Sequence, residues 1–265
     1  MFRPNQDVTR FHNRQLYNRF GMRSDDIPDS KSEGELRILV VGDSVINGGS
    51  LTDHNELATT IVQREIERNS MFKTVTVGNI SAGSWGPANQ LAYFEEFGYF
   101  KADHIVFVLS SHDYSDVPTF APLNPRTHPT SAPLSALYEG FDRYLLKAIS
   151  DHPRSAPPTV AIQRENKSLD QHRHDLLTHA ISSGASVTVI QYLNQQEITT
   201  GIPESGYSAI RHICKELGVQ TSSSEPLFSA AMKDGKQPFR DNIHPNSLGQ
   251  TLLAQMIHDS IQVDH

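Results

Sequence analysis

The chain has 265 residues, a formal net charge of -7 and a pI near 6.0. A chain of this length can bury a large core and lies within the range of single α/β domains. Because phosphate backbones are bound mainly by clustered Lys and Arg, the acidic balance argues against nucleic acid as a partner. The one cysteine, Cys214, excludes an intramolecular disulfide and a cysteine cage around a metal.

No apolar stretch approaches the roughly 20 residues that a membrane span needs. A polar segment rather than a secretory leader follows Met1. We therefore expect a soluble chain with no membrane span. Its location stays open: cytoplasmic if Met1 is the native start, and extracytoplasmic if a leader or anchor was removed.

Residues 1–34 are polar, rich in Arg and Asn, and lack a clean helical or strand period. We expect them to form an arm that packs on the surface of the domain formed by residues 35–265. Three aromatic side chains could hold this arm in place: Phe11, Tyr17 and Phe20.

From residue 36 onward, apolar runs alternate with amphipathic segments. Strands are predicted at 36–41, 74–78, 104–110 and 186–193, with a possible short fifth strand at 219–221. Helices are predicted at 56–69, 88–100, 134–149, 169–182, 205–217 and 247–263. Because helices between strands imply right-handed crossovers, we expect a three-layer α/β/α sandwich of the flavodoxin-like type with about five parallel strands.

The alternation breaks over residues 114–133, where five prolines cannot lie inside a helix: Pro118, Pro122, Pro125, Pro129 and Pro133. A long loop that leaves the carboxyl end of a strand is a candidate substrate wall or lid. A disordered insertion is the alternative.

Chemistry is first indicated where the strand 36–41 ends, at Gly42-Asp43-Ser44. In open α/β sheets, ligands bind at the carboxyl ends of the strands, so the Ser44 hydroxyl could be a nucleophile there. Alone, the motif is equally compatible with a turn in which Asp or Ser caps the next helix.

A second candidate motif precedes the last predicted helix, where the sequence reads Asp241-Asn242-Ile243-His244-Pro245. An aspartate and a histidine three residues apart in a turn can face one pocket, with the carboxylate orienting the imidazole. Together with Ser44 at the same sheet edge, they provide a nucleophile, a general base and an orienting group. Helix capping by Asp241 is the alternative, which is weaker once Gly42-Asp43-Ser44 is present.

These motifs resemble those of the SGNH hydrolase superfamily, the GDSL-like lipases and esterases. Gly42-Asp43-Ser44 with Gly48 matches the first block of the family, and Asp241 with His244 matches its last block. Between them, residues 79–86 resemble the second block and residues 110–113 the third. The similarity spans about residues 40–260, and the resemblance implies the SGNH hydrolase fold.

In the family, the oxyanion that forms during acyl transfer is held by the nucleophile's backbone N–H, a glycine N–H from the second block and an asparagine side chain from the third. The resemblance carries these roles to Ser44, to Gly83 or Ser84, and to the position of His112. Histidine replaces the asparagine, and a neutral imidazole can donate one N–H if its tautomer is fixed. We therefore expect His112 to be the third donor; the alternative is that it faces away.

The resemblance implies a serine esterase in which Ser44 attacks an ester carbonyl, His244 takes the proton and Asp241 orients His244. Neither a cofactor nor a metal is needed. The substrate is expected to be a small-molecule or glycan ester, most plausibly an O-acetyl group on a carbohydrate. An O-acetyltransferase using the same site, or a non-catalytic carbohydrate-binding protein on this fold, are the alternatives. The oligomeric state is not predicted.

Three more residues are candidates for the substrate side of the site: Asp43, Trp85 and Asp113. Trp85 could line a sugar-binding surface or pack in the core, and Asp113 could support the loop geometry. A metal site at His172 and His174 is improbable, because residues two apart on a helix point to different faces.

Overall fold

The computed structural model describes residues 2–69, 71–112, 135 and 169–261. Apart from Ser135, these residues belong to one compact unit. The predictions for the proline-rich loop at 114–133, the helix at 134–149 and Asp113 fall outside the described residues or almost entirely so. No helix in the described ranges combines the length and apolar character needed to span a membrane.

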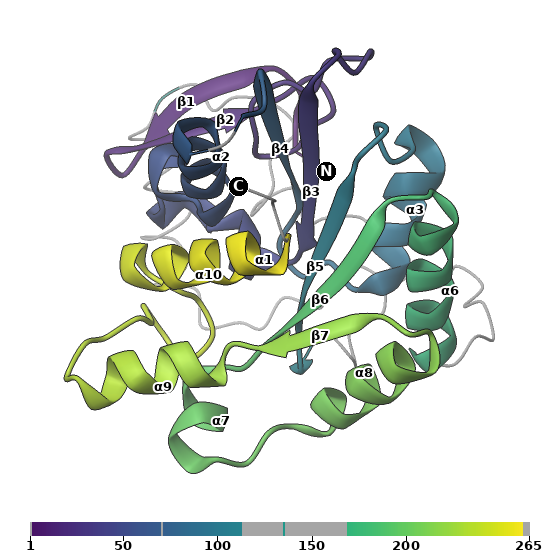
Figure 1. The fold of residues 1–265 in the computed structure, drawn as a ribbon. Helices are drawn as coiled ribbons and strands as arrows, with labels where there is room; N and C mark the ends of the chain where they lie inside the picture. The colour runs from purple at the N-terminus through teal and green to yellow at the C-terminus, as the bar shows by residue number, and fades with distance from the viewer. Residues whose placement is uncertain (1, 70, 113–134, 136–168, 262–265) are drawn as a thin grey trace. The chain divides into compact units, whose positions relative to one another are not determined.

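The centre of the unit is a sheet of five parallel strands in the order β4-β3-β5-β6-β7 (Figure 1). The strands are β3 (Glu35–Gly42), β4 (Thr74–Ser81), β5 (His104–Ser110), β6 (Ser186–Tyr192) and β7 (Gln220–Ser223). The first strand of the sheet to appear in the chain, β3, therefore lies inside it, with β4 on one side and β5 on the other. Because β3 is paired on both edges, its carboxyl end is held rigidly.

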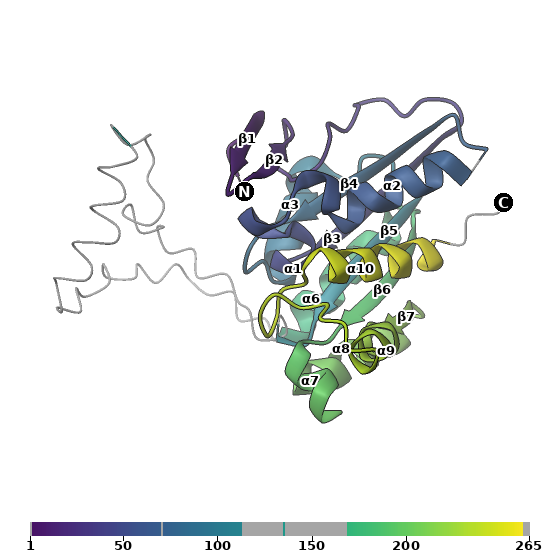
Figure 2. The same cartoon turned by 90° about the vertical axis from the view of Figure 1, so that its left-hand side faces the viewer.

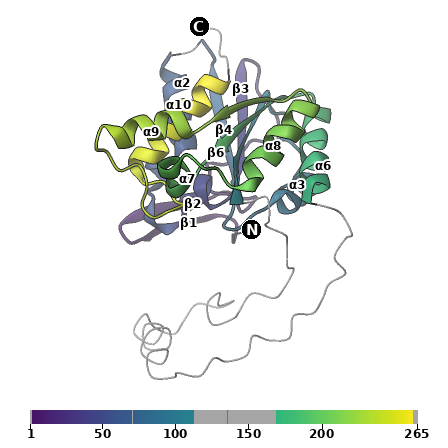
Figure 3. The same cartoon turned by 90° about the horizontal axis from the view of Figure 1, so that it is seen from below.

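Helices cover both faces of the sheet (Figures 1 and 3). The first face carries α2 (Ala58–Asn69), α9 (Glu225–Lys233) and α10 (Ser247–Ser260), whereas the second carries α3 (Pro87–Phe97), α6 (Leu169–Ser182) and α8 (Ser205–Glu216). This arrangement confirms the predicted three-layer α/β/α sandwich with five parallel strands.

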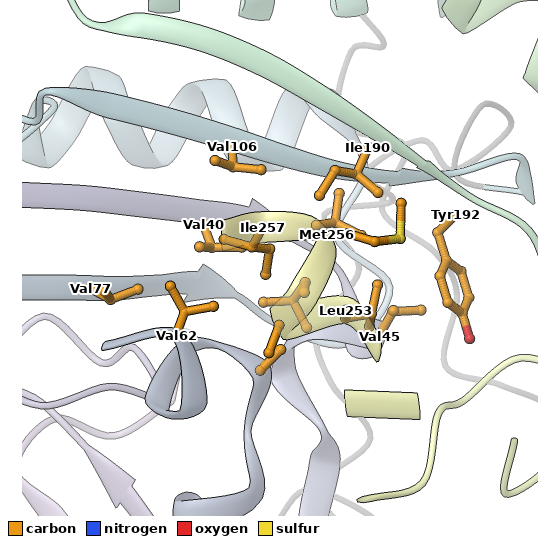
Figure 4. Packing of buried hydrophobic residues seen from close by; sticks show 14 of the residues in the cluster. Val40, Val45, Val62, Val77, Val106, Ile190, Tyr192, Leu253, Met256 and Ile257 are labelled. Carbon is orange, nitrogen blue, oxygen red and sulfur yellow. The ribbon is translucent and has the colours of Figure 1, made fainter. Parts of the chain in front are cut away.

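The alternation of side chains along β3 explains why its central residues are apolar. Ile38 and Val40 pack in the cluster on the first face, and Leu39 and Val41 pack in the cluster on the second face. All four side chains are 0% exposed. Figure 4 shows the first cluster, in which Val40 lies near Ile257 of α10. The two charged residues of β3, Glu35 and Arg37, lie near its start, where both are buried and paired with each other at 2.8 Å. From Ile38 to Val41 the strand is apolar because both of its faces are buried.

Short helices follow two of the strands. After β3 come α1 (Ser44–Asn47) and the two 3-10 helices η1 (Gly49–Leu51) and η2 (His54–Glu56); after β6 comes α7 (Gln195–Thr200). The helix α1 ends at Gly48, whose φ of 71° is a left-handed conformation that glycine adopts without strain. Neither α7 nor α9 is among the predicted elements.

The N-terminal segment contains a β-hairpin that its sequence period does not predict. Strands β1 (Gln6–Arg10) and β2 (Asn13–Tyr17) pair antiparallel and lie apart from the main sheet (Figure 2). The turn between them uses Phe11 and His12 at positive φ, 50° and 68°, where Asn-Gly is the usual signal. The two strands have mostly polar residues, which explains why the sequence of residues 1–34 shows no alternation of apolar and polar residues.

Candidate active site

The structure brings Ser44, His244 and Asp241 into one hydrogen-bonded chain. Ser44 is the first residue of α1 and His244 lies in the turn before α10, two hundred positions further along. The Oγ atom of Ser44 lies 3.0 Å from Nε2 of His244. On the other side of the ring, Nδ1 of His244 lies 2.8 Å from Oδ2 and 3.1 Å from Oδ1 of Asp241. The three groups expected to be nucleophile, base and orienting group are therefore each at hydrogen-bond distance from the next.

Asp241 is held in its ionised form. Burial alone would raise the pKa of this carboxyl, but the backbone N–H groups of His244 and Ile243 and the His244 ring lower it to about 2. Both backbone donors lie 2.8 Å from Oδ1. The same carboxylate thus fixes the turn and faces the imidazole, so it favours the His244 tautomer that has its proton on Nδ1 and a lone pair towards Ser44.

The turn that carries His244 is anchored to the carboxyl end of β6. The hydroxyl of Tyr192, the last residue of β6, donates to the carbonyl of Ile243 at 2.7 Å. Next to it, the carbonyl of Asn242 accepts from the N–H of Gln195 at 2.8 Å. Tyr192 is buried, and its position at a strand's carboxyl end is the one signal by which sequence reasoning could have singled it out.

Close packing at Gly42 and a hydrogen bond from the last helix fix the turn that carries Ser44. Gly42 leaves no room for a side chain, because a Cβ there would lie 3.0 Å from the carbonyl of Val108 and 3.2 Å from Ile46. From the last helix, the side-chain amide of Gln250 donates to the carbonyl of Val45 at 2.9 Å. Gln250 also accepts from the N–H of Ala58, so this one side chain joins α10 to both α1 and α2.

Asp43 lies beneath this turn, which corrects the expectation that it contacts substrate. Its side chain is 1% exposed. One carboxylate oxygen caps α1 by accepting from the N–H of Val45 at 2.8 Å, and the other lies 3.3 Å from Nε2 of His112. A buried carboxylate with both oxygens facing protein groups orients the nucleophile turn from inside and has no surface to offer a substrate.

The backbone donors expected for an oxyanion hole are placed by the ends of β3 and β4. None of the hydrogen bonds between described residues uses the N–H of Ser44, Gly83 or Ser84. Ser84 has a φ of 57°, a left-handed conformation that is uncommon for serine and that recurs at functional sites. A Cβ at Gly83 would meet no atom within 4 Å, so the glycine there leaves open space.

His112 follows β5 at the same edge of the sheet, with 26% of its side chain exposed. Its Nε2 faces a carboxylate oxygen of Asp43 at 3.3 Å, which orients the ring. A donor to an oxyanion would then be the other ring nitrogen, Nδ1. This role remains a prediction.

Trp85 is half-buried and packs against Tyr93 of α3, with ring centroids 5.7 Å apart. Its indole therefore belongs to the aromatic packing on the second face of the sheet. His174 of α6 lies 3.4 Å from the hydroxyl of Thr178, one turn later on the same helix. In the part of the chain that the structure describes, no group of three His, Cys, Asp or Glu side chains is arranged to hold a metal ion.

No protein-family model and no curated protein sequence matches this chain. Solved structures do match its fold. A catalytic mutant of an acetylxylan esterase from Geobacillus stearothermophilus superposes with a TM-score of 0.54 at 11% identity, covering 86% of this chain and 95% of its own. An acetyl xylan esterase named AlAXEase gives a TM-score of 0.53 at 12% identity, covering 85% of this chain and 100% of its own.

A two-domain esterase active on acetylated mannans, crystallised with mannopentaose, gives a TM-score of 0.54 at 13% identity. It covers 88% of this chain and 52% of its own length, so the match corresponds to about half of that protein. The lipase/acylhydrolase from Enterococcus faecalis has a TM-score of 0.50 at 15% identity. At these identities the likeness establishes the fold: the chain has the α/β/α fold of these esterases.

Proposed function

We propose that this protein is a serine esterase that removes O-acetyl groups from a carbohydrate. The observation that carries the proposal is the continuous chain of short contacts from Asp241 through His244 to the Ser44 hydroxyl. A serine that merely caps a helix needs no imidazole at 3.0 Å, and a histidine that merely fills a turn needs no ionised carboxylate on its far side. The three groups together match the requirements of nucleophilic acyl transfer.

In the proposed reaction, Ser44 Oγ attacks the acetyl carbonyl while Nε2 of His244 takes its proton. The resulting imidazolium is stabilised by the Asp241 carboxylate, whose low pKa keeps it charged. The oxyanion accepts hydrogen bonds from the N–H of Ser44 and from that of Gly83 or Ser84. The tetrahedral intermediate then collapses as the bond between the acyl carbon and the sugar oxygen breaks, and His244 gives its proton to that oxygen, which leaves as a hydroxyl. A water activated by His244 then hydrolyses the acyl-enzyme to release acetate and restore Ser44.

The fold neighbours support the substrate class. Two of them are acetyl xylan esterases and one acts on acetylated mannans, so proteins with this fold deacetylate more than one polysaccharide. Because function resides in sites rather than in folds, the likeness supports the proposal and the triad geometry carries it.

Labelling with a fluorophosphonate, followed by intact mass and peptide mapping, tests whether the nucleophile is activated. We expect stoichiometric modification at Ser44 that disappears in both Ser44→Ala and His244→Ala. A folded protein that takes up no label would contradict the esterase proposal and favour a sugar-binding protein.

Acetate release from acetylated xylan and from acetylated mannan then tests the reaction. If acetyl groups instead appear on an added sugar acceptor, with little free acetate, the protein is an O-acetyltransferase. Incubating one donor with and without the acceptor, and measuring acetate and acetylated product together, separates these outcomes.

A further inference from the structure

A cavity of about 260 Å³ lies outside the triad, between the N-terminal hairpin and the segment that follows α1. One wall is formed by the hairpin and the other by the residues just after the nucleophile helix. The lining residues are Phe2, Gln6, Val8, Arg10, Gln15, Tyr17, Asn47, Gly49 and Ser50.

The hairpin wall is one face of a two-stranded ribbon. Side chains two apart on a strand point to the same face, so Gln6, Val8 and Arg10 of β1 line the cavity together. Val8 pairs with Gln15 of β2, and Gln6 pairs with Tyr17, which brings these partners to the same wall. The intervening residue Thr9 lies on the opposite face and is exposed.

A buried donor in this wall has no partner. Gln15 is 4% exposed, and its Nε2 makes no hydrogen bond among the described residues. Leaving a buried amide unsatisfied costs about 1 to 3 kcal/mol. A cost of this size at the lining of a cavity indicates a group that is satisfied by something that enters the cavity.

The rest of the lining indicates what would enter. The partly exposed ring of Phe2, which stacks on the buried ring of Tyr17 with centroids 4.5 Å apart, supplies a flat apolar surface. The lining includes one charged side chain, the cation Arg10, and no carboxylate. Aromatic surface beside hydrogen-bond donors suits a sugar ring, which has C–H groups on one face and oxygen acceptors around its edge. The volume is below the range of about 300 to 1,000 Å³ found for drug-sized ligands, and so suits one ring.

The cavity also lies close to the proposed chemistry along the chain. Asn47, which lines it, is the last residue of the helix that Ser44 begins. One helical turn separates them, a rise of roughly 4.5 Å. We propose that this cavity binds one sugar ring of the acetylated glycan, as a subsite beside the nucleophile. The subsite rests on the proposed function for its role in catalysis, but its binding of sugar can be measured without it.

The test uses the full-length Ser44→Ala protein, so that bound substrate is not consumed. Xylopentaose and mannopentaose, with and without acetyl groups, are titrated by calorimetry. Val8→Trp fills the cavity, and Thr9→Trp is its matched control on the exposed face of the same strand. Gln15→Met keeps the side-chain length and removes the unpaired donor. Thermal unfolding of each variant checks that it is folded.

We expect at least one oligosaccharide to bind. Val8→Trp should abolish this binding and Thr9→Trp should leave it unchanged, while Gln15→Met should weaken it about tenfold, the value of one hydrogen bond of roughly 1.4 kcal/mol. Gln15→Met also removes the acceptor of a long hydrogen bond from the Tyr17 hydroxyl, at 3.5 Å. Because the Gln15 donor itself bonds to no described protein group, the unfolding temperature should fall by no more than this weak bond explains; a structural role of the donor would lower it further. In the background that retains Ser44, the control variant Thr9→Trp should hydrolyse 4-nitrophenyl acetate at the parent rate.

Absence of binding for every probe, or binding by Val8→Trp equal to that of the parent, would overturn the subsite. The esterase proposal fails separately, through absent labelling of Ser44. If the protein binds mannopentaose through this cavity but takes up no fluorophosphonate, the proposed subsite is supported and the esterase proposal is contradicted.

Discussion

Replacing Arg23 with methionine is expected to destabilise the fold strongly, although the residue lies in the N-terminal arm, outside the sheet. The guanidinium is fully buried and donates to three carbonyls at and after the end of the nucleophile helix: those of Asn47, at 2.8 Å, Gly49 and Thr52. These carbonyls lie at the end of α1, in η1 and directly after η1. Arg23 therefore joins the N-terminal arm to the segment that follows the nucleophile.

The magnitude follows from what the variant leaves behind. Methionine preserves most of the apolar packing but leaves three carbonyls without their donor, at about 1 to 3 kcal/mol for each one that stays buried. Removing a buried charge recovers part of this cost, because burial disfavours the charged form and lowers the pKa of Arg23. We expect a net loss of about 3 to 5 kcal/mol, which is a large share of the roughly 5 to 15 kcal/mol by which native proteins are stable.

Urea unfolding followed by tryptophan fluorescence and circular dichroism measures this loss as a lower midpoint. Arg14→Met is the matched control in the same arm, because Arg14 and its partner Asp7 are 43% and 56% exposed and such pairs contribute about 1 kcal/mol or less. A loss below about 1 kcal/mol for Arg23→Met, or one no larger than that of Arg14→Met, would refute the reasoning.

Four further predictions concern three residues of the candidate site. Asp241→Asn should lower kcat with 4-nitrophenyl acetate by about 10³ to 10⁴-fold, because the imidazole loses its orienting carboxylate; near-parental kcat would contradict the assignment. Folding lowers the pKa of Asp241 from its ordinary value of 3.8 to about 2, so the ionised carboxylate stabilises the fold at pH values above 3.8. This contribution disappears as the pH falls towards about 2. The unfolding free energies of parent and variant should therefore differ by about 1 kcal/mol at neutral pH, a figure reduced for solvent exposure, and converge in acid; a gap that does not narrow contradicts this linkage. His112→Ala should lower kcat about 100-fold, whereas His112→Asn should retain most of the parental kcat. A small loss in the alanine variant would contradict the role of His112 as an oxyanion donor. Tyr192→Phe removes the bond to the Ile243 carbonyl and should cost about 1 to 2 kcal/mol of stability together with a lower kcat, whereas unchanged kcat would show that the bond does not position His244.

The main sheet and the positions of Ser44, Asp241 and His244 at its edge could be predicted from local sequence. A strand buried on two faces is mostly apolar, so Leu36 to Val41, interrupted by the buried Arg37, predicts β3 and places Ser44 after its carboxyl end. The turn before α10 is likewise encoded locally, since Asp241 accepts from backbone donors two and three residues ahead of it.

The remaining features depend on partners far away in the chain. The hairpin has polar strands and a turn without glycine, so its pairing shows in the structure and not in its residues. From the sequence, Arg23 would be expected to be an ordinary surface cation, because the carbonyls that accept its hydrogen bonds lie 24 to 29 positions away. Tyr192 and Asp43 show the same limit: their types are visible, but the direction in which each side chain points is set by tertiary packing.

The pairing of Ser44 with His244 has a consequence for how this protein matures. The two residues are separated by two hundred positions, and Gln250 in the last helix ties down the nucleophile turn across a similar distance. During synthesis the serine emerges early, while its base and the clamp on its turn arrive near the end. A growing or truncated chain would therefore expose an inert hydroxyl, and Ser44 labelling would report completion of the whole domain rather than the presence of its first half.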